Sequence, residues 1–246
     1  PAIFQRIIYN ILQKHLTKFT KNYLDDILIY SKTKQEHLKH LDLVFEAFKQ
    51  ENIKLKLSKC QFLRASVEYL GFRLEENKIS PLHDNTASIK NFPTPTNIKN
   101  IQQFLGKVYF YNKFIPHAPK VLAPLYKLLK KDQPFVWTEE CVNKIKSLLV
   151  SQPVLSIFNP NEECFLYTDA SRVGIGAVLK QRQTDHELHP IGYFSKKLLK
   201  YQENYSVTEL ECLAIIEAID YWHHYLCGKK FTVVTDHQAL KWLKNI

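Results

Sequence analysis

The sequence of 246 residues contains no methionine, and its first residue is Pro1. A chain without an initiating methionine is expected to be an excised piece of a longer product, such as a processed polyprotein or a fragmentary reading frame. Its two ends therefore need not be domain ends. The length is enough for one large domain or two ordinary ones, each with its own hydrophobic core.

Paired cysteines and long apolar runs are also missing. The five cysteines are odd in number and include no C-x-x-C pair, which argues against a disulfide framework or a zinc ribbon and fits a reducing compartment. No apolar run approaches the length that crosses a membrane, and no signal peptide is recognisable. We therefore expect an intracellular protein without a membrane partner.

Negative charge is in short supply. The chain has 34 Lys and Arg against 24 Asp and Glu, a formal net charge of +10. Such an excess suits a polyanion, because each Lys or Arg near a phosphate releases condensed counterions. Solubilising surface charge explains the same excess, so composition favours a nucleic-acid partner only slightly.

The first half of the chain has helical and hairpin patterns in alternation. Apolar spacing predicts helices over residues 1–20 and 34–51. The sequence YLDDILIYS predicts a hairpin, and residues 55–80 alternate like paired strands with Gly71 inside the second. The predicted buried face of the second helix consists of Leu38, Leu41, Val44, Phe45 and Phe48.

Prolines and a change of pattern divide the second half. Residues 91–100 contain a proline break, and further prolines predict several short helices up to a boundary near residue 160. Three strands follow, then a helix over about 207–226 closed by Gly228, a fourth strand, and a helix from 238 that the chain end interrupts. Three strands, helix, strand and helix is an α/β layout.

Two adjacent acids interrupt an apolar run at Asp25 and Asp26. Aspartate is a favoured turn residue, so a simple turn is one interpretation. The flanking residues are apolar enough to predict a mostly buried hairpin, in which two carboxylates repel each other unless cations neutralise them. Mg²⁺ suits such oxygen ligands. The residues alone leave both interpretations open.

Three further acids lie where strands and helices should be apolar: Asp169, Glu211 and Asp236. Each has an ordinary explanation, as a turn residue, a partly solvated helix residue and a helix cap. The pair Ser206-x-x-Glu209 has capping-box spacing, which gives Glu209 a structural role. Glu211 lies about 200° further round the helix and has no such role.

The order of short motifs resembles one known family, the Pol polyproteins of gypsy-like LTR retrotransposons. The reverse-transcriptase motifs are PAIFQ at 1–5, YLDD at 23–26, KCQF at 59–62, YLGF at 69–72, FLG at 104–106 and FYNKFIP at 110–116. The motifs TDAS at 168–171, ECLA at 211–214 and TDH at 235–237 resemble the ribonuclease H domain that follows in the same family.

The resemblance implies a fold and three parts. These are a distal reverse-transcriptase palm over 1–85, a helical thumb and connection over 86–160, and a mixed-sheet α/β ribonuclease H-like domain over 161–246, incomplete at its C-terminus. The overall class is α/β, with α+β palm hairpins. A third polymerase carboxylate would lie upstream and a fourth nuclease carboxylate downstream, so we expect no polymerase activity from the isolated chain.

The resemblance also implies roles for particular residues. The catalytic and metal-binding set is Asp25, Asp26, Asp169, Glu211 and Asp236, and the nucleotide or primer contacts are Lys59, Tyr69, Leu70 and Gly71. Because Glu209 belongs to the cap and the motif ECLA begins at Glu211, we predict that Glu211, and not Glu209, faces the two aspartates of the nuclease set. The implied ion is Mg²⁺, with Mn²⁺ as the substitute. The implied partners are an RNA template, a DNA primer strand, an RNA–DNA hybrid and a dNTP.

The implied function is copying RNA into DNA and cleaving RNA in hybrids by two-metal chemistry, in the cytoplasm within a virus-like particle. The alternative is an inactive remnant that only binds nucleic acid. The sequence indicates neither the host nor the oligomeric state.

Overall fold

The structure, a computed structural model, describes residues 2–16, 18–116, 118–129, 143, 146–147 and 154–240. Contacts within the chain divide it into two compact units, Pro1–Glu76 and Asn77–Ile246. The domain boundaries near residues 85 and 160 stay predictions. Within the described ranges, no helix is both long and apolar enough to span a bilayer.

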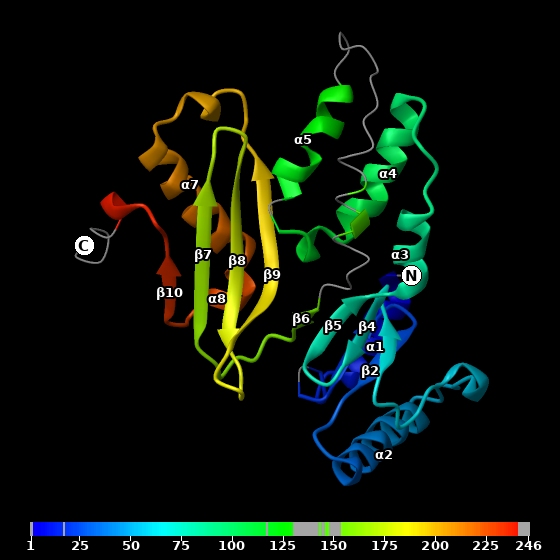
Figure 1. The fold of residues 1–246 in the computed structure, drawn as a ribbon. Coiled ribbons are helices and arrows are strands. Elements are labelled where there is room, and N and C mark those ends of the chain that lie inside the picture. Colours follow the sequence, from blue (N-terminus) through cyan, green and yellow to red (C-terminus); the bar gives the residue numbers. More distant parts are fainter. Residues whose placement is uncertain are drawn as a thin grey trace. The chain divides into compact units, whose positions relative to one another are not determined.

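Unit 1 consists of two helices and two hairpins (Figure 1). Its elements are α1 (Ala2–Leu12), β1 (Thr20–Tyr23), β2 (Asp26–Ile29), α2 (Lys34–Gln50), the 3-10 turn η1 (Leu57–Lys59), β3 (Val67–Tyr69) and β4 (Phe72–Glu75). One hydrophobic core joins α1, α2 and the β1–β2 hairpin, and its buried members are Ile8, Leu12, Phe19, Val44 and Phe48. The base of the β1–β2 hairpin is therefore fixed by packing.

Three local predictions in unit 1 are wrong. The first helix ends at Leu12, well short of residue 20. Leu38 and Phe45, expected on the buried face of α2, are 46% and 37% exposed, because only Leu41, Val44 and Phe48 reach the core. Gly71 does not lie inside a strand: Tyr69 pairs with Phe72 across a two-residue turn.

Unit 2 begins with short strands and helices. They are β5 (Lys78–Pro81), α3 (His83–Lys90), α4 (Ile98–Phe110), η2 (Asn112–Phe114), α5 (Ala118–Leu128) and β6 (Leu155–Ser156). Strand β6 pairs antiparallel with β5. The side chain of Asn97 caps α4 by accepting from the backbone N–H of Asn100 at 2.9 Å. The several short helices expected from the proline pattern are present in the described ranges.

A four-stranded sheet forms the rest of unit 2, in the order β10-β7-β8-β9. Its elements are β7 (Cys164–Ala170), β8 (Gly174–Arg182), β9 (Leu188–Lys197), η3 (Gln202–Asn204), α7 (Val207–Tyr221), α8 (His223–Leu226) and β10 (Phe231–Val234). Strand β10 runs parallel to β7, whereas β8 is antiparallel to both of its neighbours. The mixed sheet confirms the predicted α/β layout.

Helix α7 crosses one face of this sheet (Figure 1). Alternate residues of β7 and β8 point into the interface, where Leu166 and Leu179 are fully buried against Ala218 and Trp222. The helix predicted over 207–226 is interrupted at Trp222, after which the four-residue α8 begins. Gly228 ends the segment with φ +73°, as its predicted role as a helix stop requires. The final helix, predicted from residue 238, lies outside the described residues from 241 onward.

Two candidate acidic centres

The first centre is the turn of the β1–β2 hairpin. Tyr23 pairs with Asp26, so Leu24 and Asp25 form a two-residue turn. Leu24 adopts φ +51°, a left-handed conformation that is unfavourable for a leucine. Its backbone N–H donates to the side-chain oxygen of Gln5 on α1. Helix α1 therefore holds the turn that carries the aspartate pair.

The expectation that this hairpin is mostly buried is wrong at its tip. Asp25 and Asp26 are both exposed, and Tyr23 and Leu24 are 54% and 38% exposed. Apolar flanks misled the prediction because only the strand residues further along, including Ile27 and Ile29, contact the core. The carboxylates face solvent, where their mutual repulsion is screened.

The second hairpin of unit 1 lies near the first. Burial raises the pKa of Tyr69, and the charge of Asp26 raises it further, so the structure brings these two predicted site residues into electrostatic range. Leu70 and Gly71 form the turn beside Tyr69, both with positive φ, which is the two-residue hairpin turn that favours glycine. Lys59 is exposed and, among the described residues, makes no ion pair with either aspartate.

The second centre is built at the ends of two adjacent parallel strands. In the β7–β10 pairing, each β10 residue stands 67 positions after its partner, as Phe231 does after Cys164. Asp236 stands the same number of positions after Asp169. The last residue pair of this register is Val234 with Tyr167, and each aspartate stands two residues past that pair, towards the carboxyl end of its strand. Both aspartates are exposed.

Glu211 supplies the third acid from α7. Its side chain is only 5% exposed, and its Oε1 accepts from the backbone N–H of Ala170 at 3.2 Å. Its Oε2 is buried and has no hydrogen-bond partner among the described residues. Burial raises the pKa of Glu211, and the charges of Asp169 and Asp236 raise it further, against the lowering effect of the Ala170 bond. The three acids therefore share one electrostatic environment.

Glu209 has the structural role predicted for it. Its carboxylate accepts from the backbone N–H of Ser206 at 2.7 Å, while the Ser206 hydroxyl accepts from the Glu209 N–H at 3.3 Å. This capping box lowers the pKa of Glu209. The structure confirms the predicted orientation, with Glu211 directed at the strand ends and Glu209 at the helix terminus.

Sequence reasoning missed two groups beside this centre. The Thr208 hydroxyl lies 2.9 Å from His237 Nε2, which joins the first turn of α7 to the segment after β10. Arg172, in the turn after β7, bonds to two carbonyl groups ahead of α7. Both contacts join residues about thirty positions apart in the sequence, so no local sequence pattern predicts them.

Two family models match this chain. The reverse transcriptase (RNA-dependent DNA polymerase) model matches residues 1–74, and the model of the RNase H-like domain found in reverse transcriptase matches residues 137–233. The Tf2-3 transposon polyprotein of Schizosaccharomyces pombe is 40% identical over 98% of this chain. The chain belongs to the reverse transcriptase–RNase H region of gypsy-like LTR retrotransposon polyproteins.

The retrotransposon relatives are much longer than this chain. It spans 18% of the Tf2-3 polyprotein and likewise 18% of the Tf2-7 polyprotein, which is 39% identical. Solved structures of a foamy viral protease-reverse transcriptase share the fold at lower identity. The complex with dsDNA has a TM-score of 0.85 at 23% identity over 100% of this chain and 52% of its own. The complex with an RNA/DNA hybrid has a TM-score of 0.82 at 22% identity, over 99% and 33%.

The acids of the retrotransposon chain fit a divalent cation. Within the described residues, no group of three or more His, Cys, Asp or Glu side chains is arranged to hold one ion. Mg²⁺ takes only one or two protein carboxylates and completes its shell with water and phosphate oxygens, so that finding is compatible with such a site. The buried, unpartnered Oε2 of Glu211 is the clearest sign of fit, because a buried carboxylate oxygen is costly unless a donor or cation meets it.

Proposed function

We propose that unit 2 carries a ribonuclease H site that cuts the RNA strand of an RNA–DNA hybrid, with Asp169, Glu211 and Asp236 as its acidic residues. The observation that carries this proposal is the position of the Glu211 carboxylate. It is buried beside two exposed aspartates at adjacent strand ends, with one oxygen unpartnered among the described residues. A purely structural glutamate has no need of this arrangement.

Each acid has a separate task in this proposal. Asp169 and Asp236 are exposed, so they would face the phosphodiester and would hold cations on its side. Glu211 is oriented by the Ala170 N–H and presents its second oxygen to the same place. Mg²⁺, or Mn²⁺ in its stead, supplies an activated water and charge neutralisation when bound. Selectivity for RNA depends on contacts to its 2′-hydroxyl groups.

Unit 1 contributes part of a polymerase site in the same proposal. The exposed Asp25 and Asp26 would hold metal-bound phosphates of a dNTP, in line with their position at a solvent-facing turn. Lys59 would contact the nucleotide. The turn at Tyr69, Leu70 and Gly71, close to Asp26 electrostatically, would contact the primer strand. The parent polyprotein would thus copy an RNA template into DNA in the cytoplasm, within a virus-like particle.

Nucleic acid is the proposed partner of both units. The formal charge of +10 supports this, as do the exposed side chains of Lys107 and Lys127. Lys113 is a weaker candidate, because desolvation by burial lowers its pKa to about 8. Affinity for an RNA–DNA hybrid should fall steeply between about 50 and 200 mM salt. Fluorescence anisotropy measures this, and equal affinity at both concentrations would contradict a phosphate-contact interface.

The decisive experiment compares two glutamates on one helix. A 5′-labelled RNA–DNA hybrid is incubated with the chain and Mg²⁺ or Mn²⁺, and products are resolved on a denaturing gel. Glu211→Gln should abolish cleavage, because the amide cannot neutralise a cation. Glu209→Gln should retain most of the activity, because its carboxylate serves only the capping box. The matched pair separates loss of chemistry from loss of helix structure.

The outcomes also distinguish the proposed nuclease from the competing function, a remnant that only binds nucleic acid. A chain that binds the hybrid with the expected salt dependence but never cleaves it, with either ion, would favour the nucleic-acid-binding remnant. Equal cleavage by wild type and Glu211→Gln would remove Glu211 from the site. Loss of cleavage in Glu209→Gln alone would reverse the assignment of the two residues.

A further inference from the structure

The second acidic centre depends on two different kinds of attachment. Asp169 lies in β7 and Asp236 lies two residues after β10, so the parallel pairing of these strands brings both to the same end of the sheet. Glu211 belongs to α7, which has no hydrogen-bonded register with those strands. Its place relative to Asp169 is therefore set by what holds the start of α7 against the sheet. Buried Leu210 and Ala214 pack on Ile175 there, and side-chain bonds cross the same gap.

Arg172 makes such an attachment. It lies in the turn between β7 and β8, three residues after Asp169. Its Nη1 donates to the backbone carbonyl of Glu203 at 3.1 Å and to that of Tyr205 at 2.9 Å. Tyr205 immediately precedes Ser206, the N-cap of α7. One guanidinium thus joins the end of the sheet to the segment that leads into the helix, through charge-assisted bonds.

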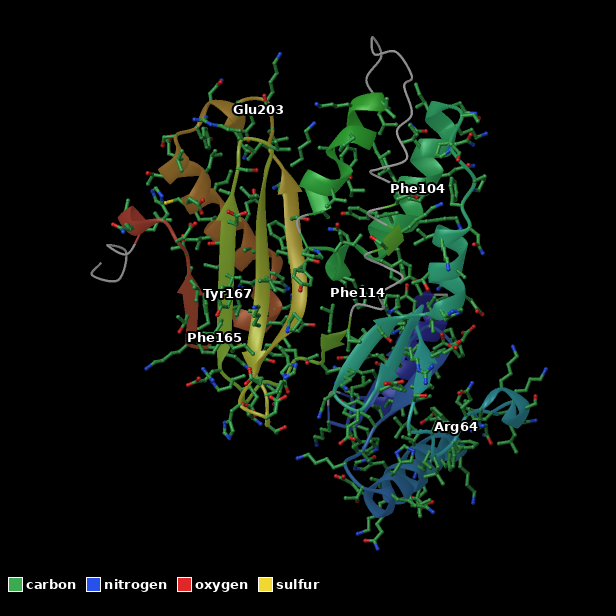
Figure 2. All side chains as sticks on the ribbon, in the orientation of Figure 1. Arg64, Phe104, Phe114, Phe165, Tyr167 and Glu203 are labelled. Carbon is green, nitrogen blue, oxygen red and sulfur yellow. The ribbon has the colours of Figure 1, made fainter. Side chains whose placement is uncertain are left out.

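Both sides of this attachment are stiff. The turn is closed by Ser171, whose backbone N–H and hydroxyl donate to the carbonyl of Gly174 at 3.0 and 2.9 Å. Figure 2 shows Glu203 beyond the end of the sheet where this turn lies. On the helix side, the capping box ties Ser206 to the first turn of α7. A displacement of Tyr205 is therefore passed on to the helix start.

A displacement of the helix start should weaken the hydrogen bond from the Ala170 N–H to Glu211 Oε1, which is 3.2 Å long. Ala170 lies between Asp169 and the turn that holds Arg172, while Glu211 lies about one helical turn beyond the N-cap. Two sets of hydrogen bonds therefore connect the end of β7 to the start of α7. One comes from the Ala170 N–H and the other from the Arg172 guanidinium.

We propose that Arg172 is a positioning residue for the acidic centre. It clamps the segment ahead of α7 to the β7–β8 turn, and thereby keeps the Glu211 carboxylate beside Asp169 and Asp236. The catalytic consequence rests on the proposed nuclease function, whereas the positioning does not. A lysine at this position keeps the charge but loses the planar geometry that fixes the two N–H directions of Nη1, the nitrogen that donates to both carbonyls.

The first test measures position without activity. Amide hydrogen exchange at Ala170 is followed by NMR in the chain alone, for wild type, Arg172→Ala and Arg172→Lys. The matched control is Lys196→Met, which breaks the 2.7 Å ion pair from β9 to Glu217 on α7, away from the helix start. Exchange at Ala170 should accelerate by about tenfold in Arg172→Ala. It should be partly restored in Arg172→Lys and unchanged in Lys196→Met.

The second test measures hybrid cleavage with Mg²⁺. Arg172→Ala should lower kcat by about tenfold or more with KM nearly unchanged, since a shift of about 1 Å in a reacting group is costly while substrate contacts remain. Lys196→Met should change neither kcat nor KM, even if it lowers the melting temperature as much as Arg172→Ala does. A general loss of stability would affect both variants alike.

The outcomes decide the proposal in each case. Wild-type exchange at Ala170 in Arg172→Ala overturns it, whatever the activity. Should wild type fail to cleave, the proposed nuclease function fails for this chain, and the exchange comparison still decides whether Arg172 positions Glu211. Should Arg172→Ala fail to fold, Arg172→Lys takes its place, with a smaller acceleration expected and wild-type exchange as the contradicting result.

Discussion

The aspartate pair of unit 1 and the three acids of unit 2 were predicted from the same kind of signal, yet the structure holds them differently. Asp25, in a two-residue turn, and Asp26, at the start of β2, are both exposed, and one bond to α1 holds that turn. Glu211 is buried, and hydrogen bonds join α7 to β7 and to the segment after β10. A solvated turn tolerates charge at little cost and adapts to what binds it. A buried carboxylate is held in place before a cation arrives, at a cost in stability.

The largest difference between the two centres is expected in how much the residues that support them contribute to stability. Leu166 is fully buried, three residues before Asp169 on the face that packs against α7. Leu166→Ala should cost about 2–5 kcal/mol of unfolding free energy through a cavity. Leu28→Ala, three residues after Asp25 on a half-buried strand, should cost about 1 kcal/mol. Chemical denaturation measures both, and equal losses would contradict the contrast in support.

A smaller effect concerns charge. Burial raises the pKa of Glu211, so ionisation disfavours the folded state. Stability is unaffected at a pH below the ordinary pKa of a glutamate and is lost as the pH rises from there through the raised folded pKa. Glu211→Gln should therefore melt higher than wild type at pH 7 without divalent ions, by roughly 2–4 °C. The difference should vanish near pH 3.

Added Mg²⁺ sharpens that measurement. Mg²⁺ that binds folded wild type but not Glu211→Gln should raise the melting temperature of the wild type. The difference in melting temperature between the two proteins at pH 7 should therefore become smaller. Differential scanning calorimetry with and without Mg²⁺ tests this. A wild type that melts higher than Glu211→Gln in the absence of divalent ions would show that the buried carboxylate is already compensated.

The helix start gives the next effect in size. Ser206→Ala removes the hydroxyl of the capping box and should cost about 1 kcal/mol of unfolding free energy. Because the same change loosens the segment bound by Arg172, exchange at Ala170 should also accelerate. Thr33→Ala removes the N-cap of α2 in unit 1 and serves as the control, with a similar loss of stability and no change at Ala170.

The smallest effect is expected at the exposed pair. Asp25→Asn and Asp26→Asn should each change the unfolding free energy by less than about 0.5 kcal/mol, because both side chains are solvated. Denaturant midpoints measure this. A loss above about 1 kcal/mol in either variant would mean that the aspartates stabilise the hairpin, and the solvated-turn description would be wrong.

The sequence predicted elements and acids well where the signal was local. The YLDD hairpin, the strands of the mixed sheet and the Ser206–Glu209 capping box all follow from short patterns, and the structure confirms them. The choice of Glu211 over Glu209 succeeded because a cap fixes one face of a helix. The metal-binding and catalytic roles of the acids stay predictions.

Burial and long-range contacts could not be predicted in the same way. The apolar flanks of Asp25 suggested a buried tip, because a sequence does not say where a strand leaves the core. Trp222 interrupts the long helix while packing on the sheet, which no propensity signals. The bonds of Arg172 to Glu203 and Tyr205 depend on how a turn and a loop meet in space.

The antiparallel pairing of β8 with β7 has a practical consequence for labelling. Gly176 lies opposite Asp169, whereas Arg182 lies at the far end of β8, opposite Leu188 of β9. The β8–β9 loop is therefore about 20 Å along the strand from the acidic end. A fluorophore or short epitope inserted in that loop would report on nucleic-acid binding or immobilise the protein without touching the acids.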